Sequence, residues 1–158
     1  MDETAPPRSD TTKAAVRKIS KQLTMPPRPA GELPKLPGNL ADITDEGLMK
    51  LSTRVYEWID YVEYHLVLSQ IDEKDAANEL EDIEGFVYVK NKSIPSVTTI
   101  KAIVSQDEDV KNAKYHALST YGNRKLCETS FNRLERAKFI LSREVTRRGY
   151  GRSTEAYT

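Results

Sequence analysis

The stretch Asp107–Arg148, DEDVKNAKYHALSTYGNRKLCETSFNRLERAKFILSREVTRR, decides the fold that we predict for this chain. It holds no proline, so one long helix is expected. Its single glycine, Gly122, is the weakest point of that helix and marks a possible bend. Wound at about 100° per residue, its second half places apolar residues on one arc, namely Cys127, Phe131, Leu134, Leu141 and Val145. Basic residues fall on nearly the opposite arc, namely Lys125, Arg133, Arg136, Arg143 and Arg147. Such a helix buries one face against protein and presents the other to an anion.

A second amphipathic helix is predicted earlier in the chain, from about residue 44 to 69. Thr44 is its expected N-cap, and two acidic residues follow where the helix dipole favours them. Its apolar positions recur at steps of three and four: Leu48, Leu51, Val55, Trp58, Ile59, Val62 and Leu66. The stripe continues from Asp72 to about Lys90 through a strongly acidic stretch, so 44–90 is either one helix or two. We interpret that stretch as a solvated acidic face or a match for the basic C-terminal helix, in preference to a cation site.

The segment between these helices is ambiguous. Residues 91–95 break the helical pattern, and the β-branched residues of 96–104 suit a strand. However, no second strand pattern exists to pair with it, and Ser96 can cap a short helix. We therefore predict a short helix here, with Asp107 capping the long helix that follows. The fold class expected is all-α, an antiparallel helical hairpin or bundle with a long C-terminal helix.

The N-terminal region differs in composition from the rest of the chain. Seven of the eight prolines lie in its first 37 residues, and this density opposes regular structure. Within it, Thr12–Leu23 places Val16, Ile19 and Leu23 at helical spacing among basic residues. This piece is either a short basic helix that orders on a partner or part of a plain disordered tail. We divide the chain into a disordered proline-rich basic arm (1–40), a helical domain (41–148) and a flexible basic tail (149–158).

Charge is segregated along the chain although the formal net charge is zero. Residues 1–37 hold seven Lys/Arg and four Asp/Glu, residues 38–110 hold six and sixteen, and residues 111–158 hold eleven and four. The basic end and the acidic middle therefore form a dipolar molecule. Such a chain can stack head to tail, pair its own halves, or direct its basic end at nucleic acid. A set of ordinary solvated helix faces is the simpler alternative.

Several classes of function find no support in the sequence. One cysteine, Cys127, allows no internal disulfide, and it fits a small core residue. His65 and His116 have no second histidine or cysteine at the spacing that a zinc site requires. The sequence also contains no phosphate-binding loop, dinucleotide fingerprint or nucleophile elbow. No apolar run reaches the roughly 20 residues of a membrane span, and the N-terminus lacks the pattern of a signal peptide. We expect a non-enzymatic cytoplasmic protein with no cofactor, no metal and no membrane partner.

The candidate nucleic-acid-binding residues are the basic arc of the long helix and the residues that follow it. Arg147-Arg148-Gly149-Tyr150-Gly151-Arg152 interleaves arginine, glycine and an aromatic residue. Arginine pairs with phosphate or stacks on a base, and tyrosine offers a π-face. The full set consists of Lys125, Arg133, Arg136, Arg143, Arg147, Arg148, Tyr150 and Arg152. A frayed basic terminus explains the last part of this pattern equally well.

The order of these parts resembles a family of phage proteins. An acidic helical centre is followed by Ser105, Asp107, Asp109 and Val110, and then by a long helix with Tyr121, Cys127, Leu134 and a basic end at Arg143, Arg147 and Arg148. Over roughly residues 44–148 this is similar to the UvsY-type recombination mediators and to small all-helical phage accessory proteins. The resemblance implies single-stranded DNA binding, ring-like homo-oligomers, and the loading of a recombinase in place of single-strand-binding protein. The proline-rich arm departs from the family pattern.

The leading hypothesis is therefore a single-stranded DNA-binding accessory factor of phage recombination or replication, acting in the host cytoplasm. The alternative is a phage virion structural or assembly protein that acts through helical protein–protein contacts and resides in the virion. A third interpretation, a host-interaction protein whose acidic face imitates nucleic acid, is disfavoured by the separate basic helix.

Overall fold

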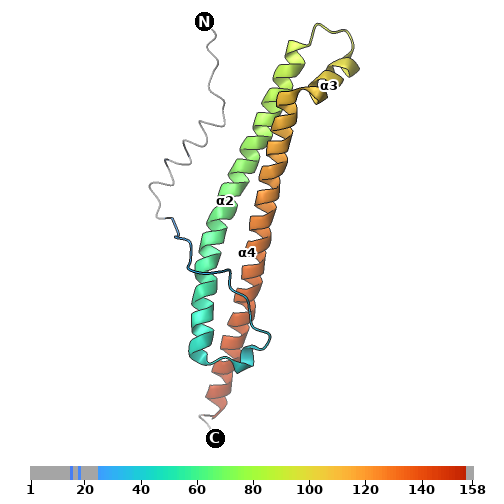
Figure 1. The fold of residues 1–158 in the computed structure, drawn as a ribbon. Coiled ribbons are helices and arrows are strands. Elements are labelled where there is room, and N and C mark those ends of the chain that lie inside the picture. Colours follow the sequence, from blue (N-terminus) through green and yellow to red (C-terminus); the bar gives the residue numbers. More distant parts are fainter. Residues whose placement is uncertain (1–14, 16–17, 19–24, 156–158) are drawn as a thin grey trace. The chain divides into compact units, whose positions relative to one another are not determined.

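The computed structural model describes residues 25–155 together with Ala15 and Lys18, and side chains as far as Gly149. The described residues form a 3-10 turn, η1 (Leu40–Asp42), and the helices α2 (Asp45–Lys90), α3 (Val97–Gln106) and α4 (Glu108–Glu155), with no strand among them (Figure 1). The predicted all-α fold with a long C-terminal helix is confirmed. The basic segment predicted at 12–23 lies outside the described residues, apart from Ala15 and Lys18, which are helical.

The helices begin at the residues that the sequence predicts as caps. The hydroxyl oxygen of Thr44 accepts a hydrogen bond from the Gly47 amide at 3.1 Å, and that of Ser96 accepts one from Thr99 at 3.3 Å. The Asp107 carboxylate accepts from the amides of Asp109 and Val110, at 3.0 and 3.3 Å. Each bond satisfies an amide that has no partner within the first turn of its helix.

Two open questions about helix boundaries are settled by the backbone. Residues 45–90 form one helix. The backbone stays helical through Asp72, and no proline lies between residues 45 and 90. The β-branched segment is helical, as favoured, since no described strand exists to pair with it. The turn at 91–95 separates these two helices.

The chain divides into two compact units. Unit 1 contains Val67–Leu126, and unit 2 contains Pro26–Leu66 with residues 127–155. Each unit therefore takes one part of α2 and one part of α4.

In unit 2 the N-terminal part of α2 packs antiparallel against the C-terminal part of α4 (Figure 1). The core contains Leu48, Val55, Trp58, Ile59 and Val62 from α2, and Leu134, Ala137 and Leu141 from α4. Leu134 and Leu141 lie on the predicted apolar arc, and Phe131 packs against the core as a partly buried residue. Val145 was also placed on that arc but is 41% exposed and does not belong to the core cluster.

The described end of the proline-rich arm is packed on unit 2. Residues 25–39 are irregular, as their prolines require, but Leu33, Leu36, Leu40 and Ile43 lie against the core, and Pro34 is buried. Gly31 adopts φ of +78°, and the Arg54 side chain beside it donates a hydrogen bond to the Glu32 carbonyl at 2.9 Å. The disordered arm was predicted to extend to residue 40. The packed region instead begins before that, because leucines placed among the prolines bury apolar surface.

In unit 1 the acidic side of α2 meets basic residues of α4. Glu73 is bonded to Arg124, Glu84 lies 2.9 Å from Lys114, and Glu79 lies 3.4 Å from His116. The buried apolar residues here are smaller than those of unit 2 and include Ala76, Val87, Ile100, Val110 and Ala113. Part of the acidic stretch of α2 is therefore paired with basic residues of α4, which was one of the interpretations that the sequence left open.

We expect Leu134→Ala to lower the free energy of unfolding by about 3 kcal/mol, because it removes buried methyl groups and leaves a cavity. Leu118→Ala is the matched control on the same helix, since Leu118 is 68% exposed, and its effect should stay below about 0.5 kcal/mol. Urea unfolding followed by circular dichroism measures both. Equal losses for the two variants would contradict the core described for unit 2.

Candidate nucleic-acid interface

One face of α4 in unit 2 presents arginines to solvent. Arg133, Arg136, Arg143 and Arg147 are all exposed. Helical periodicity puts Arg136, Arg143 and Arg147 on the side of the helix away from Leu134 and Leu141, and Arg133 at the edge of that side. At 1.5 Å per residue they extend over about 21 Å of the helix. A row of cations on a rigid helix suits a chain of phosphates.

Two apolar side chains stand within this row and were missed by the sequence analysis. Phe139 is 57% exposed and Ile140 is also exposed, and both lie between Arg136 and Arg143. The guanidinium carbon of Arg143 lies 4.5 Å from the centre of the Phe139 ring, which is a cation–π contact. Their positions in the sequence could have revealed them. Phe139 and Ile140 come three and four residues after Arg136, which places both on the arginine side of the helix.

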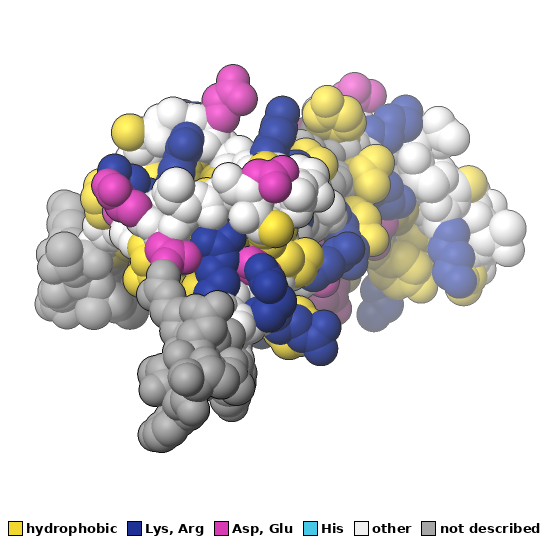
Figure 2. All heavy atoms as spheres, turned by 90° about the horizontal axis from the view of Figure 1, so that it is seen from below, with side chains coloured by type: hydrophobic (Ala, Val, Ile, Leu, Met, Phe, Trp, Pro, Cys, Tyr) yellow, Lys and Arg dark blue, Asp and Glu magenta, His cyan; other side chains and the backbone are white. Residues whose placement is uncertain are grey.

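A shallow hollow of about 490 Å³ adjoins this face, lined by Asn132, Glu135, Arg136, Phe139 and Ile140. We call the exposed set Arg133, Arg136, Phe139, Ile140, Arg143 and Arg147 the basic face. Figure 2 shows Lys and Arg side chains exposed beside hydrophobic ones on the side of the molecule drawn there. This combination can pair with phosphate and stack on a base from the same surface.

The arginines of the basic face differ in whether a carboxylate of the same chain already pairs with their charge. Arg133, Arg136 and Arg143 have no ion-pair partner among the described residues. Arg147 donates two hydrogen bonds to Glu144, at 2.6 and 2.8 Å, and these bonds raise the pKa of Arg147. Hydrogen bonds from Arg147 and Arg148 lower the pKa of the Glu144 carboxyl to about 2. At neutral pH the Glu144 carboxylate therefore offsets part of the Arg147 charge.

Arg148 occupies a different environment from its neighbours in the predicted set. Its side chain is 17% exposed and donates to the carbonyls of Leu40 and Ile43 at 2.7 and 2.8 Å. It also donates to the carboxylates of Asp45 and Glu144, each at 2.8 Å. These bonds join α4 to η1 and to the start of α2, so Arg148 has a structural role here.

The predicted set has three further members, Lys125, Tyr150 and Arg152. Lys125 is exposed on α4 but belongs to unit 1. Tyr150 and Arg152 lie in the last turns of α4, which continues to Glu155 where a flexible tail was expected from residue 149. Their side chains lie outside the part that the structure describes.

Within the described residues, no cluster of three or more His, Cys, Asp or Glu is arranged to hold a metal ion. Cys127 is a free, partly buried thiol. None of the described helices has the length and apolarity needed to cross a membrane.

Comparisons of the chain with protein-family models, with curated proteins and with solved structures found no match. The resemblance to UvsY-type mediators therefore stays a prediction from the sequence.

We expect Arg148→Ala to lower the free energy of unfolding by about 2 kcal/mol, because it removes charge-assisted hydrogen bonds from partly buried acceptors. Arg147→Ala is the matched control, since Arg147 is more exposed and shares the Glu144 partner, and its stability should change little. Thermal unfolding at neutral pH compares the two. An Arg148→Ala variant as stable as the parent would show that the joint at η1 does not depend on this side chain.

Proposed function

We propose that this protein is a non-enzymatic accessory factor that binds single-stranded DNA through the basic face of α4. The observation that carries the proposal is an exposed aromatic ring placed within a row of four exposed arginines, three of which have no ion-pair partner among the described residues. Arginine supplies sequence-independent attraction to phosphate, and an aromatic face stacks on any base.

The same geometry favours a single strand over a duplex. Phe139 stands on the outside of a helix, where an unstacked base can lie against its ring. The bases of a duplex are stacked on one another, so only the phosphates would be reached by this face. Binding without sequence preference is what a factor acting along a strand requires.

The acidic part of the chain restricts where DNA can bind. The whole chain is formally neutral, so it does not attract DNA through its net charge. In unit 2 the exposed side of α2 carries Glu57, Asp60 and Glu63, which repel phosphate. Contact is then confined to the basic face of α4. By its resemblance to UvsY-type mediators, we assign the protein to phage recombination or replication, as a homo-oligomer that helps load a recombinase in place of single-strand-binding protein.

A labelled oligonucleotide followed by fluorescence anisotropy tests this proposal. We expect Arg136→Ala with Arg143→Ala to weaken single-strand binding at least about ten-fold, and to reduce the slope of log affinity against log salt by about 1.4, since two phosphate contacts are lost. Lys74→Ala with Lys101→Ala is the matched control, because both lysines are exposed but lie in unit 1. No binding by the parent protein at low salt would refute the proposal.

The stacking role of Phe139 is tested separately. We expect Phe139→Ala to cost about 1–3 kcal/mol in single-strand binding and much less in duplex binding, because only unstacked bases reach the ring. Tyr115→Ala is the control, since Tyr115 is 77% exposed but lies in unit 1 and does not belong to the basic face. Equal losses on both nucleic acids would show that the ring does not stack.

A second candidate function is supported by apolar surface in unit 1. Tyr115, Leu118 and Leu126 are strongly exposed on α4, and exposed apolar groups of this kind mark protein contacts. They favour the alternative of a virion structural or assembly protein. The anisotropy titration separates the two proposals, because an assembly protein gains nothing from the arginine and phenylalanine of the basic face.

A further inference from the structure

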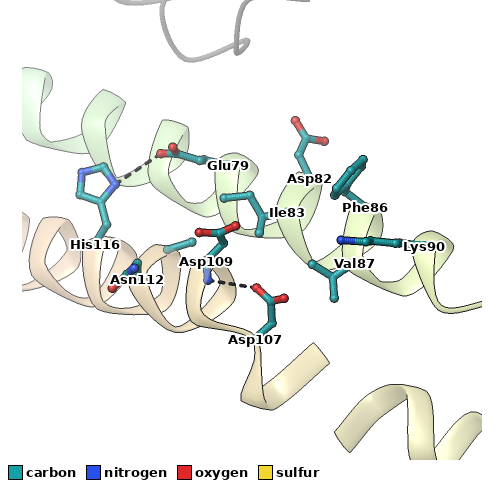
Figure 3. Close-up of a pocket in the computed structure, with 11 residues that line it drawn as sticks. Glu79, Asp82, Ile83, Phe86, Val87, Lys90, Asp107, Asp109, Asn112 and His116 are labelled. Atoms are coloured by element: carbon teal, nitrogen blue, oxygen red, sulfur yellow. Dashed lines mark hydrogen bonds and ion pairs between the residues drawn. The ribbon is translucent and has the colours of Figure 1, made fainter. Parts of the chain in front are cut away.

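A groove in unit 1 combines an apolar floor with an acidic rim (Figure 3). It encloses about 560 Å³ between the C-terminal part of α2 and the first turns of α4. Ile83, Val87 and Ala113 supply apolar surface, and Phe86 projects at its edge with 71% of its surface exposed. An exposed phenylalanine beside a groove is surface that a partner can cover.

The rim of this groove carries an excess of negative charge. Four carboxylates line it, against the ammonium group of Lys90 and the imidazole of His116, and they are Glu79, Asp82, Asp107 and Asp109. Glu79 is engaged by His116 at 3.4 Å, and Asp107 accepts the capping bonds of α4. Asp82 and Asp109 are exposed and have no ion-pair partner within the described part of the chain. The groove therefore suits an occupant with apolar residues on one side and cations flanking them.

The chain carries one segment with this chemistry. In residues 12–23, Val16, Ile19 and Leu23 fall on one helical arc, and the flanking charges are all positive: Lys13, Arg17, Lys18 and Lys21. Ala15 and Lys18, the described residues of this segment, are helical and exposed, and both fall off the apolar arc. We propose that residues 12–23 dock as a basic amphipathic helix into the groove of unit 1 in the same chain.

Docking would supply the packing surface that residues 12–23 need in order to stay helical. A free helix of about a dozen residues is marginal in water, so its helicity must come from packing an apolar face. The three apolar side chains would cover Phe86 and the groove floor, while the lysines and arginine approach Asp82 and Asp109. Because the segment is tethered to the unit that it binds, association is intramolecular and needs only modest affinity.

The proposal is independent of the DNA-binding function. It uses residues of unit 1 only, and none of them belongs to the basic face. Its consequence is that the acidic groove is neutralised by the chain's own arm, which leaves the arginines of unit 2 as the cations available to an anion.

Hydrogen–deuterium exchange of the full-length protein, read by mass spectrometry, tests this docking. We expect amides in residues 12–23 to exchange at least about ten-fold more slowly than in a free peptide of the same sequence, because docked helices are protected from exchange. Phe86→Ser with Asp82→Lys should abolish this protection. Both residues are exposed, so the variant keeps the α2–α4 packing of unit 1.

Val89→Ser with Asp72→Lys is the matched control, since both residues are exposed on α2 in unit 1 but do not line the groove. This control should keep the protection of the parent. A charge swap in the arm, Lys18→Glu with Lys21→Glu, should remove it without touching the groove. Unprotected amides in the parent, or protection that survives the groove variant, would overturn the proposal. Protection that disappears on dilution would also overturn it, by placing the segment on a second copy.

Discussion

The packing of Leu134 and Leu141 of α4 against the apolar stripe of α2 is the interaction on which unit 2 depends. When an α-helix packs against its neighbour through one face only, side chains on the opposite face point to solvent, because side chains repeat every 3.6 residues. Burying the two leucines therefore directs Arg136, Phe139 and Arg143 to solvent. The basic face needs no loop or pocket to position it, and its rigidity comes from the core beneath it.

The same core explains why the end of the arm is packed. The two packed helices leave an apolar margin, which is a strip of apolar surface beside their line of contact. Leu33, Leu36 and Leu40 cover part of it. Arg148 then joins this margin to the end of α4 by donating to two backbone carbonyls and two carboxylates. Its neighbour Arg147 donates hydrogen bonds to Glu144 and stays exposed. Adjacent arginines thus differ in role because helical geometry points one toward η1 and the other to solvent.

Unit 1 is organised by different forces. Its buried residues include the small side chains of Ala76 and Ala113, and several of its contacts are ion pairs that are partly open to water. Such pairs contribute little stability but select which residues lie opposite one another. Large apolar groups such as Phe86 and Leu126 remain exposed. Unit 1 is accordingly the part of the described chain with most surface for further protein contacts, whereas unit 2 carries the charged face suited to an anion.

Local features of this fold could be read from the sequence because they depend on neighbouring residues. The caps at Thr44, Ser96 and Asp107, the break at 91–95 and the outward direction of Arg136 and Arg143 all follow from backbone bonding and a 3.6-residue period. Other features required the tertiary structure, because they depend on residues far apart in the chain. Periodicity placed Val145 on the apolar arc, and the arginine-glycine-tyrosine run placed Arg148 among the binding residues. Val145 is nevertheless 41% exposed, and Arg148 donates to carbonyls more than one hundred positions earlier. The exposure of Phe139 and the packing of Leu33 and Leu36 were likewise set by which surfaces the two long helices cover, and no local pattern contains that information.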